Sequence, residues 1–209
     1  MMALAQFDHL VMAANDLDTG AAYVAERLGA EPSGGGKHVT LGTHNKLWRL
    51  GAIYLEVIAI DPEAERPARP RWFALDALQQ SERPRLMTWV ARTQALAVVL
   101  SNEMHPVVHV HSFSRGPYRW LFTLAAADGL SEGGLVPPLI EWQTAHPLEA
   151  MPDSGCGLKT FEGWHPEPVK VRAVLAPLGL ESALTVHTGE TPRLRAVIQT
   201  PKGEVVFES

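Results

Sequence analysis

Short apolar runs alternate with polar stretches along the chain, and their order predicts a repeated supersecondary unit. Residues 7–15 are predicted to form a strand because they are mostly apolar and end at polar residues. Residues 19–29 form the pattern of an amphipathic helix, with Asp16 as its N-cap and Gly29 as its C-cap. Three more strands are predicted, at residues 37–43, 45–51 and 52–60. The first part of the chain therefore follows the order strand, helix, three strands.

The same order is predicted twice more. A polar, proline-rich connection at residues 61–84, with a short helix at residues 74–79, separates the first stretch from the second. The second stretch has a strand at residues 85–93, a helix at 94–102 and strands at 106–114, 119–126 and 137–145. The third has a strand at residues 158–164, a helix at 166–180 and strands at 184–190, 192–200 and 204–209.

These patterns predict three βαβββ modules in an α+β protein, at residues 5–60, 85–145 and 158–209. Each closing strand contains a glutamate, namely Glu56, Glu141 and Glu208. An internal repeat of this length indicates duplication of a supersecondary unit. The alternative interpretation is one irregular α+β domain.

Composition narrows the classes of function. The chain of 209 residues is 46% hydrophobic and 20% charged, with a net charge of −5, which is typical of a globular protein. It has no cluster of Lys and Arg, so nucleic-acid binding is not indicated. No apolar run reaches membrane-spanning length, and the N-terminus lacks a basic region, so we expect a cytoplasmic protein. Cys156 is the single cysteine, which excludes an internal disulfide and a multi-cysteine zinc site.

The first module resembles a known family. Residues 7–29, with His9 in the strand, and residues 52–60, with Glu56, resemble the opening and closing elements of the vicinal oxygen chelate superfamily. More narrowly, the chain from about residue 5 to residue 180 resembles glyoxalase-like domains of the glyoxalase 3 type. The resemblance implies that modules one and two form one compact unit in which curled mixed sheets enclose a cup.

The resemblance also implies a metal site. His9, Glu56 and Glu141 match the family's ligand positions for a divalent ion such as Zn, Ni, Mn or Fe, and Glu56 and Glu141 are the candidate catalytic carboxylates. Thr88 stands where the family places a fourth ligand, and threonine is a poor ligand. Taken alone, His9 is better explained as a buried histidine that is hydrogen-bonded to a neighbour; together with Glu56, the two interpretations are equally good.

Other side chains are candidates for substrate binding. Gly34–Gly36 does not fit a phosphate loop because a strand rather than a helix follows; a tight turn from helix into strand is expected. His38, His44 and Asn45 are predicted to line the cup, with residues 43–45 at a hairpin connection. Arg115 offers a fork of donors to an anionic group, and Trp142 could stack on a ligand.

Several functions fit these features. The first is a metal-dependent lyase or isomerase of glyoxalase type that acts on a small oxygenated molecule in the cup. The alternative is metal-free binding or sequestering of a small molecule on the same fold, which Thr88 favours. A third is a domain that has lost its site and serves assembly. No nucleic-acid or membrane partner is expected. Module three is predicted to pack on the other two or on a second subunit, giving a homodimer.

Overall fold

The computed structural model describes residues 4–78, 83–101, 108–125 and 130–209. Its α-helices and strands follow the order strand, helix, three strands three times. The first set is β1 (Gln6–Ala13), α1 (Leu17–Leu28), β2 (Gly34–His38), β3 (Thr43–Leu50) and β4 (Ile53–Ile60). The second is β5 (Arg85–Arg92), α2 (Leu96–Leu100), β6 (Val108–Arg115), β7 (Tyr118–Ala125) and β8 (Leu139–Trp142). The third is β9 (Gly157–His165), α3 (Pro168–Leu175), β10 (Thr185–Thr188), β11 (Arg193–Thr200) and β12 (Gly203–Glu208).

Short 3-10 helices lie in the connections: η1 (Val39–Leu41), η2 (Trp72–Ala77), η3 (Ser131–Gly134), η4 (Pro147–Ala150) and η5 (Ala176–Leu178). The predicted element ends at residues 79, 102, 106–107 and 126 lie outside the described residues. No described helix has the length and apolar character needed to cross a membrane.

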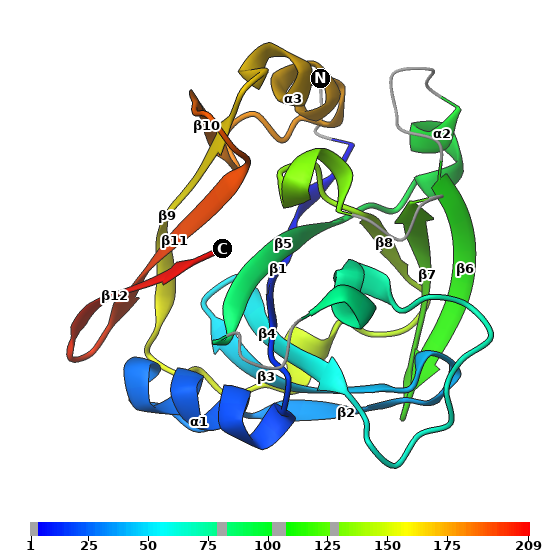
Figure 1. The fold of residues 1–209 in the computed structure, drawn as a ribbon, viewed down its shortest axis with the longest axis vertical. Helices are drawn as coiled ribbons and strands as arrows, with labels where there is room; N and C mark the ends of the chain where they lie inside the picture. Colours follow the sequence, from blue (N-terminus) through cyan, green and yellow to red (C-terminus); the bar gives the residue numbers. More distant parts are fainter. Residues whose placement is uncertain (1–3, 79–82, 102–107, 126–129) are drawn as a thin grey trace.

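The first two sets of strands form one curled sheet in the order β2-β3-β4-β1-β5-β8-β7-β6. The sheet is mixed, because β1 runs parallel to β4 and antiparallel to β5. It curls until its two edge strands, β2 and β6, come into contact (Figure 1). The predicted class, α+β with curled mixed sheets, is confirmed.

The third set forms a separate sheet in the order β10-β9-β11-β12. This order differs from that of the first set. β9 lies between β10 and β11, whereas β1 lies beside β4, the last strand of its own set. A parallel β9-α3-β10 crossover accounts for the difference, since the helix returns the chain to the strand next to β9. The third set thus repeats the chain order but not the sheet order.

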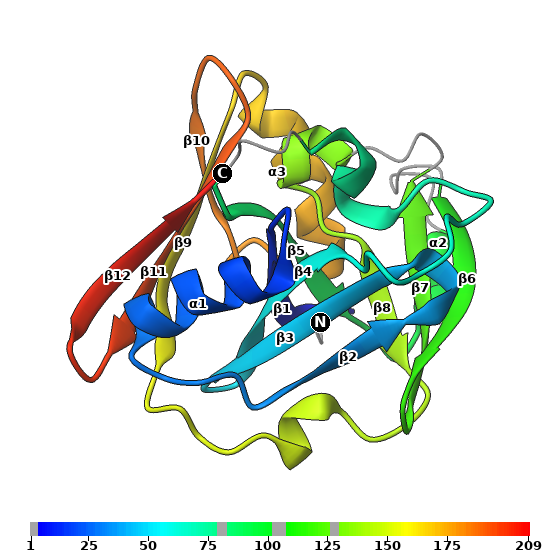
Figure 2. The same ribbon diagram turned by 60° about the horizontal axis from the view of Figure 1, so that its bottom comes forward.

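The two larger apolar cores of the described residues lie on opposite faces of the curled sheet. The outer core joins the convex face to the small sheet; there Phe161 of β9 packs on Phe7 and Trp89, with ring centroids 5.4 and 5.7 Å apart. α1 also packs on this side, where it lies near the small sheet (Figure 2). The inner core lies inside the curl and includes Trp72 and Phe122. The inner face is the one that positions the candidate site.

The caps of α1 are those that the sequence predicts. The Asp16 carboxylate accepts a hydrogen bond from the backbone N–H of Thr19 at 2.7 Å, which satisfies a free donor at the start of α1. Gly29 ends the helix in a left-handed conformation, with φ of 67°.

The prediction for residues 34–45 was wrong in detail. Gly34–Gly36 belongs to β2 rather than to a turn, and His44 and Asn45 lie within β3 rather than at a hairpin connection; η1 makes the turn between the two strands. Close packing explains the glycines, because a Cβ on Gly35 would lie 2.2 Å from the backbone oxygen of Asn45.

The helix predicted at residues 74–79 was also wrong in its position and type. η2 begins earlier, at Trp72, and is a 3-10 segment. Phe73 and Ala74 inside it take left-handed φ values of 57° and 55°, which interrupt a regular helix. As a result, Trp72 and Phe73 both turn toward the inner core.

Candidate functional site

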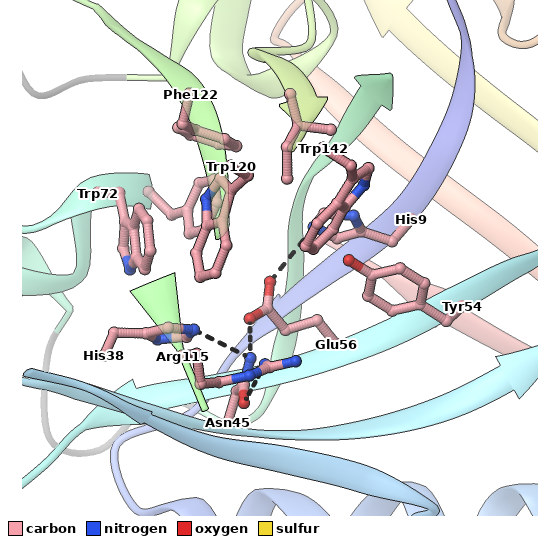
Figure 3. Close-up of a pocket in the computed structure, with 12 residues that line it drawn as sticks. His9, His38, Asn45, Tyr54, Glu56, Trp72, Arg115, Trp120, Phe122 and Trp142 are labelled. Carbon is pink, nitrogen blue, oxygen red and sulfur yellow. Dashed lines mark hydrogen bonds and ion pairs between the residues drawn. The ribbon is translucent and has the colours of Figure 1, made fainter. Parts of the chain in front are cut away.

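A cup inside the curled sheet is the candidate site (Figure 3). The space in it that a water-sized sphere can occupy is only about 30 Å³, so a ligand larger than water would have to displace side chains that line the cup. β1, β2, β3 and β4 contribute side chains from one half of the sheet, β6, β7 and β8 from the other, and η2 from the connection between the halves. Its rings are Tyr54, Trp72, Phe73, Trp120, Phe122 and Trp142, and its polar side chains are His9, His38, Asn45, Glu56 and Arg115.

A buried ion pair lies at the centre of this cup. His9 on β1 and Glu56 on β4 face the same side of the sheet, with His9 Nε2 3.4 Å from Glu56 Oε2. Burial alone would lower the pKa of His9, but hydrogen bonds and negative charge from Asp8 and Glu56 raise it above its usual value. Burial alone would raise the pKa of Glu56, but His9, His38 and Asn45 lower it to about 2. Both shifts favour the charged forms of the pair, an imidazolium and a carboxylate.

A β-bulge brings Asp8 to the same side as His9. Phe7 pairs with Ala91 and His9 with Val90, so Asp8 is an extra residue in β1. Phe7 consequently joins the outer core, whereas Asp8 Oδ1 lies 2.6 Å from His9 Nδ1. The bulge thus places two consecutive side chains together on the inner face.

Asp8 is fully buried and hydrogen-bonded on both carboxylate oxygens. Its Oδ2 atom accepts from the indole N–H of Trp142 at 3.0 Å and lies 2.9 Å from Nε2 of His146. Burial alone would raise the pKa of Asp8, but the hydrogen bonds and charges of His146 and His9 hold it well below its usual range. Burial, together with the charges of Asp8 and Glu56, raises the pKa of Tyr54 well above its usual value. Asp8 therefore fixes the His9 ring, on which Tyr54 stacks with centroids 4.4 Å apart.

Asn45 connects this pair to a second cation. Its amide N–H donates to Glu56 Oε1 at 2.5 Å, and its carbonyl oxygen accepts from Arg115 Nη1 at 2.8 Å. His38 lies beside it, 3.4 Å from the amide nitrogen. Burial, and then the positive charge of Arg115, lowers the pKa of His38 to about 4, although Glu56 opposes the shift. His38 is therefore neutral at pH 7, packed edge-on against the ring of Trp72.

Six of the eight candidate residues line the cup, namely His9, His38, Asn45, Glu56, Arg115 and Trp142. Glu141 does not, because Ile140 and Trp142 on either side of it face the cup and successive strand residues alternate. Its carboxylate instead accepts from the backbone N–H of Leu96 at the start of α2, at 2.9 Å. His44 neighbours Asn45 on β3 and likewise does not line the cup.

Sequence reasoning missed other residues of the site. Tyr54 could have been found, because it is two residues before Glu56 and strand alternation places both on one face. Asp8 could not, because alternation assigns it to the face opposite His9 unless the bulge is known. His146 is 138 residues from Asp8, and the sequence carries no signal that joins them.

The donor set does not fit the expected divalent metal ion. Of the three expected ligands, His9 and Glu56 come together and bind each other, whereas Glu141 lies outside the cup. Thr88 donates its hydroxyl to the backbone oxygen of Gly134 at 2.9 Å. The cationic guanidinium of Arg115 lines the same cup, where it would repel a second cation. Across the described part of the chain, no three His, Cys, Asp or Glu residues are arranged to hold a metal ion.

Comparison with known proteins supports the family resemblance. A family model described as a glyoxalase-like domain matches residues 7–179. A hypothetical protein from Staphylococcus aureus has a similar structure, with a TM-score of 0.63, 16% identity and coverage of 98% of this chain and 85% of that chain. A variant of the methylmalonyl-CoA epimerase from Streptomyces coelicolor, in complex with 2-nitronate-propionyl-CoA, has a TM-score of 0.50 and 18% identity over 68% of this chain and 100% of that chain. No curated protein matches the chain. At these identities the structural matches show the fold alone.

Proposed function

Because the chain belongs to the glyoxalase-like domain family, we propose that it binds a small oxygenated molecule in the cup and transfers a proton on it. One observation carries this proposal: the buried His9–Glu56 pair lies in an aromatic-walled cup rather than on the surface. Perturbed acid and base groups that meet in a cavity are typical of sites of proton transfer. A resident divalent ion is not part of the proposal, because the donor set does not fit one.

The chemistry would follow from the charges of the pair. The Glu56 carboxylate would accept a proton from a carbon next to a carbonyl group, and the C–H electron pair would become an enolate. The His9 imidazolium would move its Nε2–H from Glu56, 3.4 Å away, to the enolate oxygen and donate a hydrogen bond there. Return of the proton from Glu56 to the same carbon would exchange its hydrogen with solvent, and delivery to the neighbouring carbon of an enediolate would complete an isomerisation. A ligand that displaces the amide of Asn45 from Glu56 would also remove a hydrogen bond that lowers the pKa of this carboxyl, making it a stronger base.

Hydrogen exchange in D2O tests this proposal without a known substrate. A panel of 2-oxoaldehydes and 2-oxo acids is incubated with the protein, and loss of their C–H signals is followed by proton NMR. We expect exchange of at least one compound with wild-type protein and its loss in Glu56→Gln. Glu141→Gln is the matched control, because Glu141 lies outside the cup, and it should retain exchange.

Metal content is measured on the same protein by elemental mass spectrometry. About one transition metal per chain, lost on substitution of His9 and Glu56 by alanine, would contradict the metal-independent part. Exchange that is equal in wild-type protein and Glu56→Gln would contradict the assignment of the base.

A second candidate function is binding without turnover. The indoles of Trp72, Trp120 and Trp142 on the walls of the cup favour it, since such rings retain flat ligands by stacking. Binding detected by tryptophan fluorescence, with no hydrogen exchange in any compound, would support this function over the first.

We infer the modular organisation and assembly from the repeated element order. The modules would span residues 5–60, 85–145 and 158–209, with the first two forming the cup. A homodimer is proposed because β10 and β12 are edge strands of the small sheet, and exposed edges are usually covered. Light scattering at micromolar concentration tests it, and a monodisperse monomer would contradict the dimer.

A further inference from the structure

We propose that Arg115 makes the cup selective for a small flat molecule that carries a carboxylate. This inference rests on the proposed function, since it assumes that the cup is the ligand site, and it names the class of ligand. Its basis is a buried guanidinium that lacks an anionic partner.

Arg115 makes no direct ion pair within the described residues; Asn45 separates it from the carboxylate of Glu56. Arg115 is only 9% exposed, yet no carboxylate of the described chain lies within ion-pairing distance of its guanidinium. Its hydrogen-bond partner is the neutral carbonyl oxygen of Asn45, and its guanidinium carbon lies 5.7 Å from the centroid of the Tyr118 ring. A buried charge without a counter-ion is costly, so an anionic ligand would stabilise this arrangement.

Arg115 reaches the cup across the seam where the curled sheet closes. It is the last residue of the edge strand β6, and Gly36 lies in the opposite edge strand, β2. A Cβ on Gly36 would lie 3.1 Å from Cδ and 3.2 Å from Cγ of Arg115. Gly36 also has a φ of 154°, which L residues rarely adopt. Because Gly36 has no side chain, it leaves room for the Arg115 side chain to pass across the seam.

Neighbouring side chains then fix the orientation of the guanidinium. Asn45 holds Arg115 through its oxygen and is itself held by Glu56 through its amide N–H (Figure 3). Since an amide oxygen satisfies one of the five N–H groups of arginine, donors remain for a ligand. The planar fork of arginine matches the geometry of a carboxylate.

The walls of the cup account for the flat shape of the ligand. Trp120 and Trp142 pack with ring centroids 5.4 Å apart, and Trp72 and Phe122 with centroids 5.6 Å apart, so rings enclose much of the space. Aromatic walls favour flat ligands that can stack on them. The indole N–H of Trp72 is buried without a hydrogen-bond partner in the described chain.

The test compares two probes of almost equal shape, benzoate and its neutral analogue benzamide. Binding is followed by tryptophan fluorescence, because three indoles line the cup. We expect benzoate to bind at least about tenfold more tightly than benzamide, as a charge-assisted hydrogen bond implies. Arg115→Gln should remove this preference while benzamide binding persists. Arg119→Gln, which removes the same charge from an exposed position on β7, should keep the preference.

A second pair of variants tests the passage at the seam. Gly36→Ala should reduce the preference for benzoate, because the added methyl group would displace the Arg115 side chain. Gly34→Ala is its control, since a Cβ there would make ordinary contacts of 3.4 Å or more with Leu47. Circular dichroism establishes that each variant is folded, and Arg115→Gln still tests the inference if Gly36→Ala does not fold.

The outcomes of this test separate the carboxylate inference from the proposal that the cup binds a small molecule. Equal affinity of wild-type protein for benzoate and benzamide, or a preference that survives in Arg115→Gln, would overturn the carboxylate inference and leave the small-molecule cup standing. Equal loss of both probes in Arg115→Gln would show that Arg115 is structural only. Failure of both probes to bind would overturn the inference, and the separate exchange experiment would then decide the proposed function.

Discussion

Replacement of Asp8 by asparagine tests whether the network behind His9 stabilises the fold. The substitution retains the size and shape of the side chain but removes the negative charge. It also replaces one acceptor oxygen with an NH2 group, which would face a donor on His9, His146 or Trp142. At least one buried hydrogen bond is therefore lost, and the imidazolium of His9 loses a counter-ion.

The magnitude follows from burial. Asp8 is 0% exposed, so solvent does not screen its contact of 2.6 Å with His9. Removal of one partner from a buried charge pair typically costs about 3–5 kcal/mol. We expect Asp8→Asn to lower the free energy of unfolding by about this amount at pH 7. Asp18→Asn is the control; Asp18 is exposed in the first turn of α1, and the loss should stay below about 1 kcal/mol.

The pH dependence of the free energy of unfolding gives a second, independent test. The pKa of Asp8 is lower in the folded protein than in the unfolded chain, so its charge stabilises the fold above the unfolded value of about 4. This contribution is lost as the pH falls through the folded pKa. The difference in the free energy of unfolding between wild-type protein and Asp8→Asn should therefore become smaller below about pH 4.

Urea unfolding at a series of pH values, followed by tryptophan fluorescence, measures both effects. A loss below about 1 kcal/mol at pH 7 would refute the reasoning, because the network would then contribute no more than a surface ion pair. A difference that widens toward acid pH would refute the assigned ionisation of Asp8.

The other predictions concern the cup and the strands around it. Glu141→Gln should leave ligand affinity within about twofold of wild type, because Glu141 does not face the cup. It should lower the free energy of unfolding by about 1 kcal/mol, because the carboxylate caps α2. A large loss of affinity in the fluorescence titration would show that Glu141 belongs to the site. Gly35→Ala should destabilise the fold by more than about 1 kcal/mol, since the new Cβ would lie 2.2 Å from the backbone oxygen of Asn45; thermal unfolding beside Gly34→Ala measures this, and equal melting temperatures would contradict it. The free energy of unfolding of wild-type protein should fall as the pH drops from about 6.5 to about 4, because the pKa of His38 is lowered to about 4 in the folded protein and its protonation favours the unfolded chain. His38→Gln should make this fall smaller. An unchanged pH profile in urea unfolding would contradict this.

Alternation and capping residues made much of the fold predictable from the sequence. The caps of α1 depend on local chemistry at Asp16 and Gly29, which the sequence displays directly. His9 and Glu56 meet as expected, because a strand and its parallel neighbour place them on one face. The family resemblance supplied this pairing of distant segments, which periodicity alone cannot give.

The failures have specific physical causes. β8 has four residues, Leu139–Trp142, with apolar side chains on both faces, so its pattern cannot say which face Glu141 takes. The bulge at Asp8 depends on pairing with β5, which is remote in sequence. The strand order of the third set depends on the path of α3 over the small sheet, and a list of elements does not contain that path.

The pairing of β1 with β5 also has a consequence for how the chain folds. These two first strands are neighbours at the centre of the large sheet, although the whole of the first set separates them in sequence. Each half of the sheet therefore ends at a strand whose hydrogen bonds are completed by the other half. Contacts between residues as distant as Gln6 and Arg92 must form before the cup exists, and such long-range pairing slows folding. A fragment that ends before β5 would leave an edge of β1 unpaired, so neither half of the cup should be an autonomous folding unit.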